Sequence, residues 1–318
     1  MSGTCFLVTG SEGCLGSWAV KRLVERGERC VALDLTSEAA RLRKLLPEER
    51  IRGVTFVRGD VLEDGLLERL IEEHGVTHIV HLAALQIPLV AADPVRGAAV
   101  NVVGTVRVLE AARRQRGRVR GVVYASSAAV FGPDGRPCPA TLYGAFKRCN
   151  EETARVFWET EGLASVGLRP WAVFGPGRDQ GLTAAPTHAM KAVALGLPYH
   201  IPFGGRVDLQ YARDVADAFI AAAVADARAA VVLNLRGSVI SIDELVALVE
   251  DVWPGARGLV THGDDPIPIE ADLEADGLRE LLGDLPATDV RVSVRETLEH
   301  FAALARAGLL DEGELSAA

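Results

Sequence analysis

A tyrosine and a lysine four residues apart carry the clearest sign of chemistry in this sequence. Tyr143 and Lys147 would share one face of a helix that we expect to run to about Glu161. A nearby ammonium lowers the pKa of a phenol, which suits a group that takes a proton from a secondary alcohol near neutral pH. With only four lysines and four tyrosines in the chain, this spacing is informative, although a surface pair is the alternative.

Two serines follow the strand expected over residues 121–125. Ser126 and Ser127 would lie at the carboxyl edge of a parallel sheet, where open α/β folds bind ligands. A serine hydroxyl at that edge can hold a substrate oxygen during hydride transfer. The alternative is that the pair forms only a turn at the end of the strand.

A glycine-rich segment directly after the first expected strand indicates a phosphate-binding loop. Its spacing is Gly-x-x-Gly-x-x-Gly, and it leads into a helix expected over residues 17–26. Such a loop lets the backbone approach a diphosphate and directs the amides at the start of a helix toward the anion. A structural glycine turn is the alternative. The residues that we expect to contact a dinucleotide here are Gly10, Gly13, Cys14, Leu15 and Gly16.

Asp34 would end the second strand, 18 positions after Gly16. A carboxylate there accepts hydrogen bonds from a ribose diol and repels a 2′-phosphate, so the predicted cofactor is NAD rather than NADP. Arg41 and Arg43 lie a few residues further on and are the argument for NADP. A simple turn at the end of the strand is the alternative for Asp34.

Short apolar runs alternate with amphipathic stretches through the first half of the chain. This alternation predicts an α/β fold, with a Rossmann-type doubly wound parallel sheet and a smaller C-terminal substrate-binding lobe. Several prolines divide the chain after Leu168 into short pieces. We therefore expect an NAD-binding domain over residues 1–168, rejoined by about 206–236, and a substrate-binding lobe from residues 169–205 and 237–318. Capping boxes predict helices beginning at Ser241 and at Ser293.

Composition excludes several classes of function. The 34 basic and 43 acidic residues give a net charge of −9, so we expect neither nucleic acid nor an anionic membrane as a partner. No stretch reaches the ~18 apolar residues of a membrane span, and the N-terminus resembles no secretion signal. Five scattered cysteines lack metal-ligand spacing, which predicts no metal site and a cytoplasmic location with reduced thiols.

Taken together and in order, these motifs resemble those of the extended short-chain dehydrogenase/reductases, specifically the NAD-dependent epimerase/dehydratase family. The likeness covers nearly the whole chain. It includes Gly59-Asp60-Val61, His81-Leu82-Ala83-Ala84, the serine pair with Ala-Ala-Val-Phe-Gly, and Leu168-Arg169-Pro170 with Val173-Phe174-Gly175-Pro176-Gly177. It implies a homodimer and a small sugar-like substrate.

The resemblance also implies a role for each matching residue. Tyr143 would be the catalytic acid/base, Lys147 its electrostatic partner and a ribose ligand, and Ser127, preferred to Ser126, the group that polarises the substrate oxygen. The remaining cofactor-site residues are Asp60 and Val61 beside the adenine, Ala83 and Ala84 along the trough, Val173 beside the nicotinamide, and Asn101 as a support for the backbone.

Departures from the family pattern bear on the substrate. Ser127-Ala128-Ala129 stands where sugar dehydratases have Thr-Asp-Glu, so dehydration is disfavoured. Ala172 replaces an asparagine that touches the substrate in nucleotide-sugar epimerases, and Arg206 is displaced by one residue from the usual diphosphate-binding element. The substrate-contact candidates are Ser126, Arg178, Thr183, His188 and Arg206.

Three functions remain open on the sequence. The first is an NAD-dependent sugar epimerase that retains its cofactor. The second is a net dehydrogenase of a sugar or sugar acid that uses the same residues and releases NADH. The third is a non-catalytic NAD-binding sensor, and the complete Ser127, Tyr143 and Lys147 set argues against it.

Overall fold

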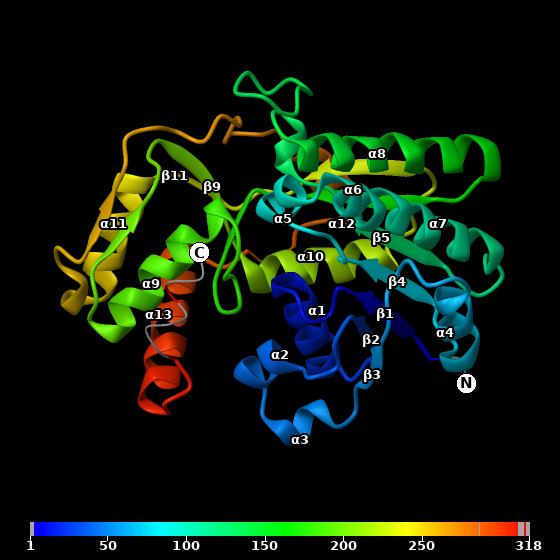
Figure 1. Cartoon of the computed structure of the whole chain (residues 1–318), viewed down its shortest axis with the longest axis horizontal. Helices are drawn as coiled ribbons and strands as arrows, with labels where there is room; N and C mark the ends of the chain where they lie inside the picture. The colour runs from blue at the N-terminus through cyan, green and yellow to red at the C-terminus, as the bar shows by residue number, and fades with distance from the viewer. Residues whose placement is uncertain (1–2, 286, 311–314, 316–318) are drawn as a thin grey trace.

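The computed structural model describes residues 3–285, 287–310 and 315. Among these residues, seven parallel strands form a central sheet in the order β10-β6-β5-β4-β1-β2-β3. Figure 1 labels five of these neighbours, β5, β4, β1, β2 and β3. The strands are β1 (Cys5–Thr9), β2 (Arg29–Asp34), β3 (Thr55–Arg58), β4 (His78–His81), β5 (Gly121–Ala125), β6 (Ser165–Arg169) and β10 (Ala230–Asn234). The predicted doubly wound parallel sheet is confirmed.

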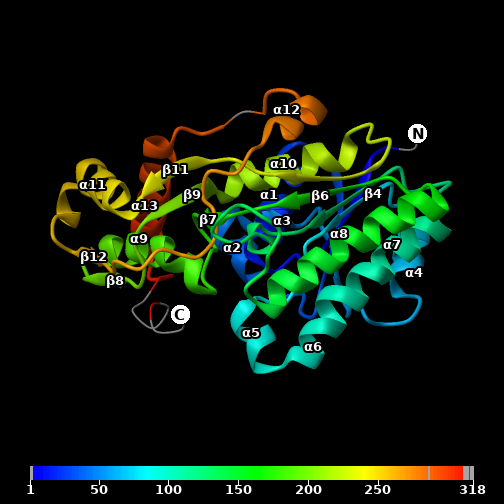
Figure 2. The same ribbon diagram turned by 90° about the horizontal axis from the view of Figure 1, so that it is seen from above.

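Helices cover both faces of this sheet because each strand-to-strand crossover must bury an apolar helix face. One layer packs α1 against α10 and α2, and the other packs α7 against α4 and α8 (Figure 2). The bounds are α1 (Cys14–Glu25), α2 (Ala40–Leu45), α10 (Ala212–Val224), α4 (Leu66–His74), α7 (Gly104–Arg114) and α8 (Leu142–Glu161). The helix predicted over residues 17–26 begins earlier, at the glycine loop itself.

A second group of elements packs around its own apolar core at one end of the sheet (Figure 1). Its sheet has the order β11-β9-β7, with a separate β12-β8 pair, and α13 packs against α9 and α11. The elements are β7 (Ala172–Phe174), β8 (Tyr199–Ile201), β9 (Arg206–Tyr211), β11 (Ser238–Ser241), β12 (Val260–His262), α9 (Ala185–Leu195), α11 (Ile242–Val252) and α13 (Val290–Arg306).

Shorter helices complete the connections between these elements. α12 packs against β10 and α10, while α5, α6 and η1 follow one another after β4. Their bounds are α3 (Glu48–Ile51), α5 (Ile87–Ala92), α6 (Pro94–Ala98), η1 (Ala99–Val103), η2 (Ala128–Val130), η3 (Leu182–Ala184), η4 (Pro254–Ala256) and α12 (Asp276–Leu282).

The two predicted capping boxes have different outcomes. Ser241 accepts a hydrogen bond from Glu244 N while the Glu244 side chain accepts one from Ser241 N, so the first box is confirmed. The second prediction is wrong, because α13 begins before Ser293 and is capped by the side chain of Asp289. Ser293 lies inside the helix, where its hydroxyl donates to Val290 O.

Candidate functional site

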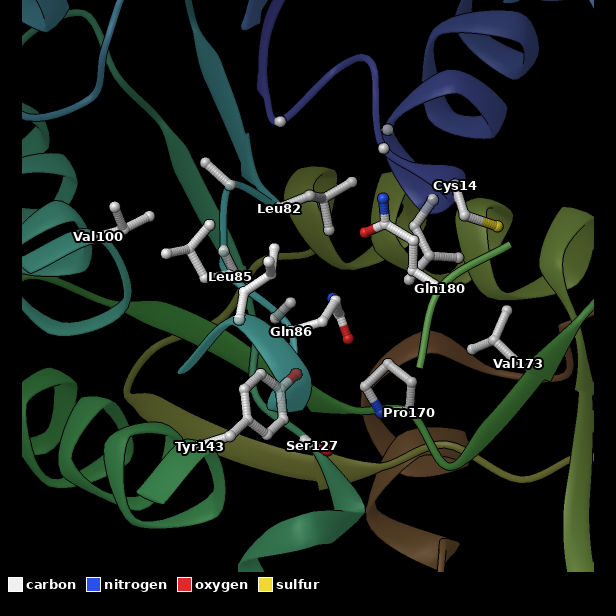
Figure 3. Close-up of a pocket in the computed structure, with 18 of the residues that line it drawn as sticks. Cys14, Leu82, Leu85, Gln86, Val100, Ser127, Tyr143, Pro170, Val173 and Gln180 are labelled. Atoms are coloured by element: carbon white, nitrogen blue, oxygen red, sulfur yellow. The ribbon is translucent and has the colours of Figure 1, made fainter. Parts of the chain in front are cut away.

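A cleft of about 390 Å³ opens where the central strands end and the second group of elements begins. In Figure 3, Tyr143, Ser127, Gln86 and Pro170 face one space, with Cys14 and Gln180 on the side of the glycine loop. Most of the predicted site residues line this cleft: Gly10, Gly13, Cys14, Leu15, Gly16, Asp34, Asp60, Val61, Ala83, Ala84, Ser126, Ser127, Tyr143, Lys147, Val173, Arg178 and Thr183.

The glycine loop fits an anionic diphosphate. Gly10 has a φ of +71°, and a Cβ on it would lie 2.6 Å from the backbone N of Ala83, so no other residue fits the turn. Gly13 precedes α1 without a side-chain cap, and the first turn of the helix contains no acidic residue. The free amides at this helix start therefore remain available to a bound anion.

Asp34 is held at the rim of the cleft by backbone amides. One carboxylate oxygen accepts a hydrogen bond from Glu12 N at 2.8 Å, and the other accepts one from Leu35 N at 2.7 Å. Each carboxylate oxygen can accept further bonds, so the side chain can also receive a ribose diol. Its predicted role in choosing NAD stays a prediction.

Lys147 is almost completely buried, with 3% of its surface exposed. Its Nζ donates a hydrogen bond to Ala125 O at 2.7 Å and lies 5.5 Å from the centroid of the Tyr143 ring. Burial lowers the pKa of Lys147 to about 8. The lysine therefore connects α8 to the end of β5 and places a cation beside the phenol.

The expected lowering of the Tyr143 pKa is wrong for this structure. Burial raises the pKa of Tyr143, while the positive charge of Arg178 and a hydrogen bond with Ser127 oppose that rise. Desolvation outweighs both because it disfavours the charged phenolate directly. The cation that acts on the phenol is Arg178, whereas Lys147 directs its ammonium to a backbone carbonyl.

The two serines have different partners. Ser126 Oγ donates to Glu151 Oε1 at 2.5 Å, and that buried carboxylate also binds Arg169 at 2.6 Å. Ser127 Oγ caps η2 by accepting from Ala129 N at 3.1 Å and shares a hydrogen bond with Tyr143. Ser126 lines the cleft, but its hydroxyl is engaged by Glu151, whereas Ser127 shares its hydrogen bond with the phenol; the substrate contact of Ser126 stays a prediction.

Asn101 supports the cleft from behind and is not one of its lining residues. Its Oδ1 accepts from Leu85 N at 2.7 Å and its Nδ2 donates to Leu85 O at 2.9 Å. Asn101 lies in η1, a π-helical turn, which is a frequent local feature of functional sites. Both ends of its amide thus fix the backbone of Leu85, which is the supporting role that the resemblance implied for Asn101.

Two substrate-contact candidates lie outside the cleft. His188 is fully buried in α9, where its ring stacks on Tyr199 with 6.1 Å between centroids, and burial lowers its pKa. Arg206 is exposed at the start of β9, opposite Ser241 in the antiparallel pair. Both predictions are corrected: packing of α9 buries the histidine, and the strand register holds the arginine at the surface.

Arg178 and Thr183 do line the cleft, and they contact each other. Arg178 Nη2 donates to Thr183 Oγ1 at 2.9 Å. The Nε of Arg178 is buried and has no hydrogen-bond partner among the described residues. The Nε of Arg178 is thus a buried donor that could form a hydrogen bond to an acceptor atom of a polar ligand.

Other lining residues were missed by the sequence reasoning. Trp171 directly follows Arg169-Pro170, and its Nε1 donates to Glu270 O at 2.7 Å, which brings Ile269 to the cleft wall. A contact between segments about one hundred residues apart has no local sequence signal. The further missed residues include Gln86, Arg96, Asp179 and Gln180, and Arg41, considered above only as an argument for NADP, also lines the cleft.

Comparison with known proteins assigns the family. The sequence profile of the NAD-dependent epimerase/dehydratase family matches residues 6–235. The chain belongs to this family. The resemblance noted from the motifs is therefore confirmed, together with the fold that it implied.

Individual relatives of this family member are sugar-nucleotide epimerases. A UDP-glucose 4-epimerase of Azospirillum brasilense is 30% identical over 315 residues, which cover 89% of this chain and 87% of that protein. UDP-glucuronate 4-epimerase 2 of Arabidopsis thaliana is 32% identical over 190 residues, covering 55% of this chain and 43% of the plant protein. The chain thus spans less than half the length of the plant relatives that it matches.

Solved structures of family members are also similar. The UDP-glucose 4-epimerase of Thermus thermophilus, in complex with NAD, gives a TM-score of 0.77 at 26% identity, covering 94% of this chain and 99% of that one. MoeE5 in complex with UDP-glucuronic acid and NAD gives a TM-score of 0.76 at 27% identity, covering 96% of this chain and 100% of that one.

Among the residues that the structure describes, none of the helices combines the length and the apolar character that a membrane span requires.

Proposed function

We propose that this protein catalyses NAD-dependent epimerisation at a secondary alcohol carbon of a sugar or sugar-derived substrate. The observation that carries the proposal is one cleft that joins Tyr143, Ser127 and Lys147 to the glycine loop and Asp34. Membership of the NAD-dependent epimerase/dehydratase family supports it. The epimerase relatives support epimerisation, rather than net oxidation, as the outcome of the reaction.

Three side chains divide the work on the substrate. Tyr143 takes the proton from the substrate hydroxyl and later returns it, and Ser127 holds the same oxygen by a hydrogen bond. Lys147 holds α8 at the end of β5 and donates to a cofactor ribose, while the charge of Arg178 stabilises the phenolate. Bound NAD supplies the reversible hydride acceptor that the protein side chains lack.

A net dehydrogenase of a sugar or sugar acid is the second candidate. It is favoured by the exposed position of Arg206 and by Ala172, which lacks the amide of the nucleotide-sugar epimerases. In this reaction Tyr143 performs the same proton transfer, but NADH leaves after each turnover. Retention of the cofactor is therefore what separates the two functions.

We further propose the setting in which the protein works. The substrate-binding lobe comprises residues 169–205 and 237–318 together with β9, which packs in the second core, and the NAD-binding domain comprises the rest. All five cysteines are free, which supports a reducing, cytoplasmic compartment. A homodimer follows from family likeness, and exposed Val103 and Val156 on η1 and α8 offer apolar contacts for it. The UDP-sugars named for the relatives are the substrates to test first.

The proposal is tested by the cofactor content of freshly purified protein. After denaturation, chromatography should release close to one NAD per chain, and dialysis before denaturation should not reduce that amount. The protein should then interconvert C4 epimers in a panel containing UDP-glucose and UDP-glucuronate. Protein that is empty as purified and reduces added NAD in proportion to product would instead identify a dehydrogenase.

A further inference from the structure

An ion pair crosses the mouth of the cleft between two segments that are far apart in the sequence. Arg41 on α2 binds Asp179 in the loop after β7 through both carboxylate oxygens, with Nη2 at 2.7 Å from each and Nε at 3.1 Å from Oδ2. The two side chains are only 27% and 33% exposed. Bidentate geometry with partial burial makes such a pair stronger than an ordinary surface bridge.

The same arginine is tied to the glycine loop. Arg41 Nη1 donates to Glu12 O, and Glu12 N donates to the carboxylate of Asp34. Ala39 N donates to Glu12 Oε1 at 2.6 Å, and Ala39 is the only non-glycine residue with positive φ in the described part of the chain. The start of α2 is thus held against the loop in a conformation that costs about 1 kcal/mol or more.

The opposite segment, the loop after β7, is held at Pro176 by Trp18 and at Arg178 by Thr183. Trp18 Nε1 donates to Pro176 O at 2.8 Å, which fixes the start of the loop against α1. Gly177 follows with a φ of +87° and passes close to the Arg41 side chain. Beyond it, Gln180 lies on the glycine-loop side of the cleft (Figure 3). The pairing of Arg41 with Asp179 therefore secures the part of the loop that overhangs the cleft.

We propose that Arg41 and Asp179 form a clasp that slows the release of NAD. Both side chains line the cleft beside Gly13, Cys14 and Asp34, the residues expected to hold the diphosphate and the ribose. A dinucleotide held by these residues would lie next to the ion pair. In this proposal the loop moves when the cofactor leaves, so breaking the pair makes release faster.

Charge alone makes a different prediction, and this makes the clasp testable. Asp179 repels a diphosphate and Arg41 attracts one. If only charge mattered, removing the carboxylate would slow NAD release and removing the guanidinium would accelerate it. A clasp needs both partners, so loss of either one accelerates release.

The experiment measures cofactor exchange without any substrate, so its outcome is independent of the reaction proposed above. Protein is loaded with NADH and chased with excess NAD, and the loss of bound-NADH fluorescence gives the release rate. The variants are Arg41→Gln and Asp179→Asn, with Asp179→Glu to restore the carboxylate. Asp217→Asn is the matched control, because it breaks the Arg22–Asp217 pair between α1 and α10 outside the cleft.

We expect Arg41→Gln and Asp179→Asn each to accelerate release by roughly fivefold to tenfold, the effect of losing about 1 kcal/mol or slightly more. Asp179→Glu and Asp217→Asn should remain within about twofold of the parent, and high salt should accelerate the parent more than Asp179→Asn. Release from Asp179→Asn that is unchanged or slower overturns the clasp. Equal acceleration by Asp217→Asn overturns it as well, since the effect would then be general loosening of the fold.

Discussion

Tyr143 and Lys147 are both buried, and burial shifts each pKa toward the uncharged form. Their position on one face of a helix was predictable, because a helix places residues four apart on the same face whatever surrounds it. The sign of the Tyr143 shift was not, since it depends on desolvation by the whole cleft and on Arg178. The choice between Ser126 and Ser127 likewise depends on Glu151, a partner 25 residues further along the chain.

The depressed pKa of Lys147 predicts a rise in stability with pH. The unfolded chain keeps the lysine proton up to about pH 10.5, whereas the folded chain releases it near pH 8. Between these values the unfolded state binds more protons, so the free energy of unfolding increases with pH. Lys147→Met removes this dependence. In urea unfolding, the unfolding free energy of the parent minus that of Lys147→Met should be about 1 kcal/mol larger at pH 9 than at pH 7. A constant difference between the two proteins would refute the assignment.

Arg178 should set the pH at which Tyr143 becomes an effective base. Its charge stabilises the phenolate, so Arg178→Met raises the pKa of Tyr143 and moves the limb of the kcat/KM profile to higher pH. Thr183→Val removes the hydroxyl that contacts Arg178 but keeps the charge, and its profile should stay in place. Matching profiles for the parent and Arg178→Met would exclude this electrostatic role.

At the scale of elements, helix α8 is positioned by a polar cluster beneath the cleft. Glu151 accepts hydrogen bonds from Ser126 on the β5 side and from Arg169 on β6, and it is 4% exposed. The helix itself was predictable from its pattern, and its predicted end at about Glu161 is confirmed. The contacts of Glu151 with β5 and β6 were not predictable. Glu151 is one of several acidic residues in this helix, and the neighbouring sequence does not show which of them is buried.

Removing the charge of Glu151 should weaken this attachment strongly. Glu151→Gln leaves Arg169 buried without its carboxylate, which costs about 3–5 kcal/mol of unfolding free energy. Glu159→Gln on the exposed part of the same helix removes a surface pair with Arg155 and should cost less than about 1 kcal/mol. Both values come from urea unfolding. Equal costs in the two variants would show that the cluster does not hold the helix.

At the scale of the whole molecule, the central sheet was predictable and the walls of the substrate cleft were only partly so. Alternating strands and helices constrain one another locally, so they determine the sheet. The cleft is closed by segments from the second core, such as Trp171 with Glu270, whose meeting depends on long-range packing. His188 was misplaced for the same reason, because α9 packs in that core and buries the histidine.

The most direct test of this account is an epimerisation assay in D₂O with Tyr143→Phe beside the parent. Parent protein should convert a sugar nucleotide into its C4 epimer without solvent deuterium at C4 and without net NADH, because the same hydride leaves and returns. Tyr143→Phe should lose at least about 100-fold in kcat while still binding NAD, and Tyr199→Phe outside the cleft should stay active. Accumulation of NADH in step with an oxidised product, or full activity of Tyr143→Phe, would contradict the account.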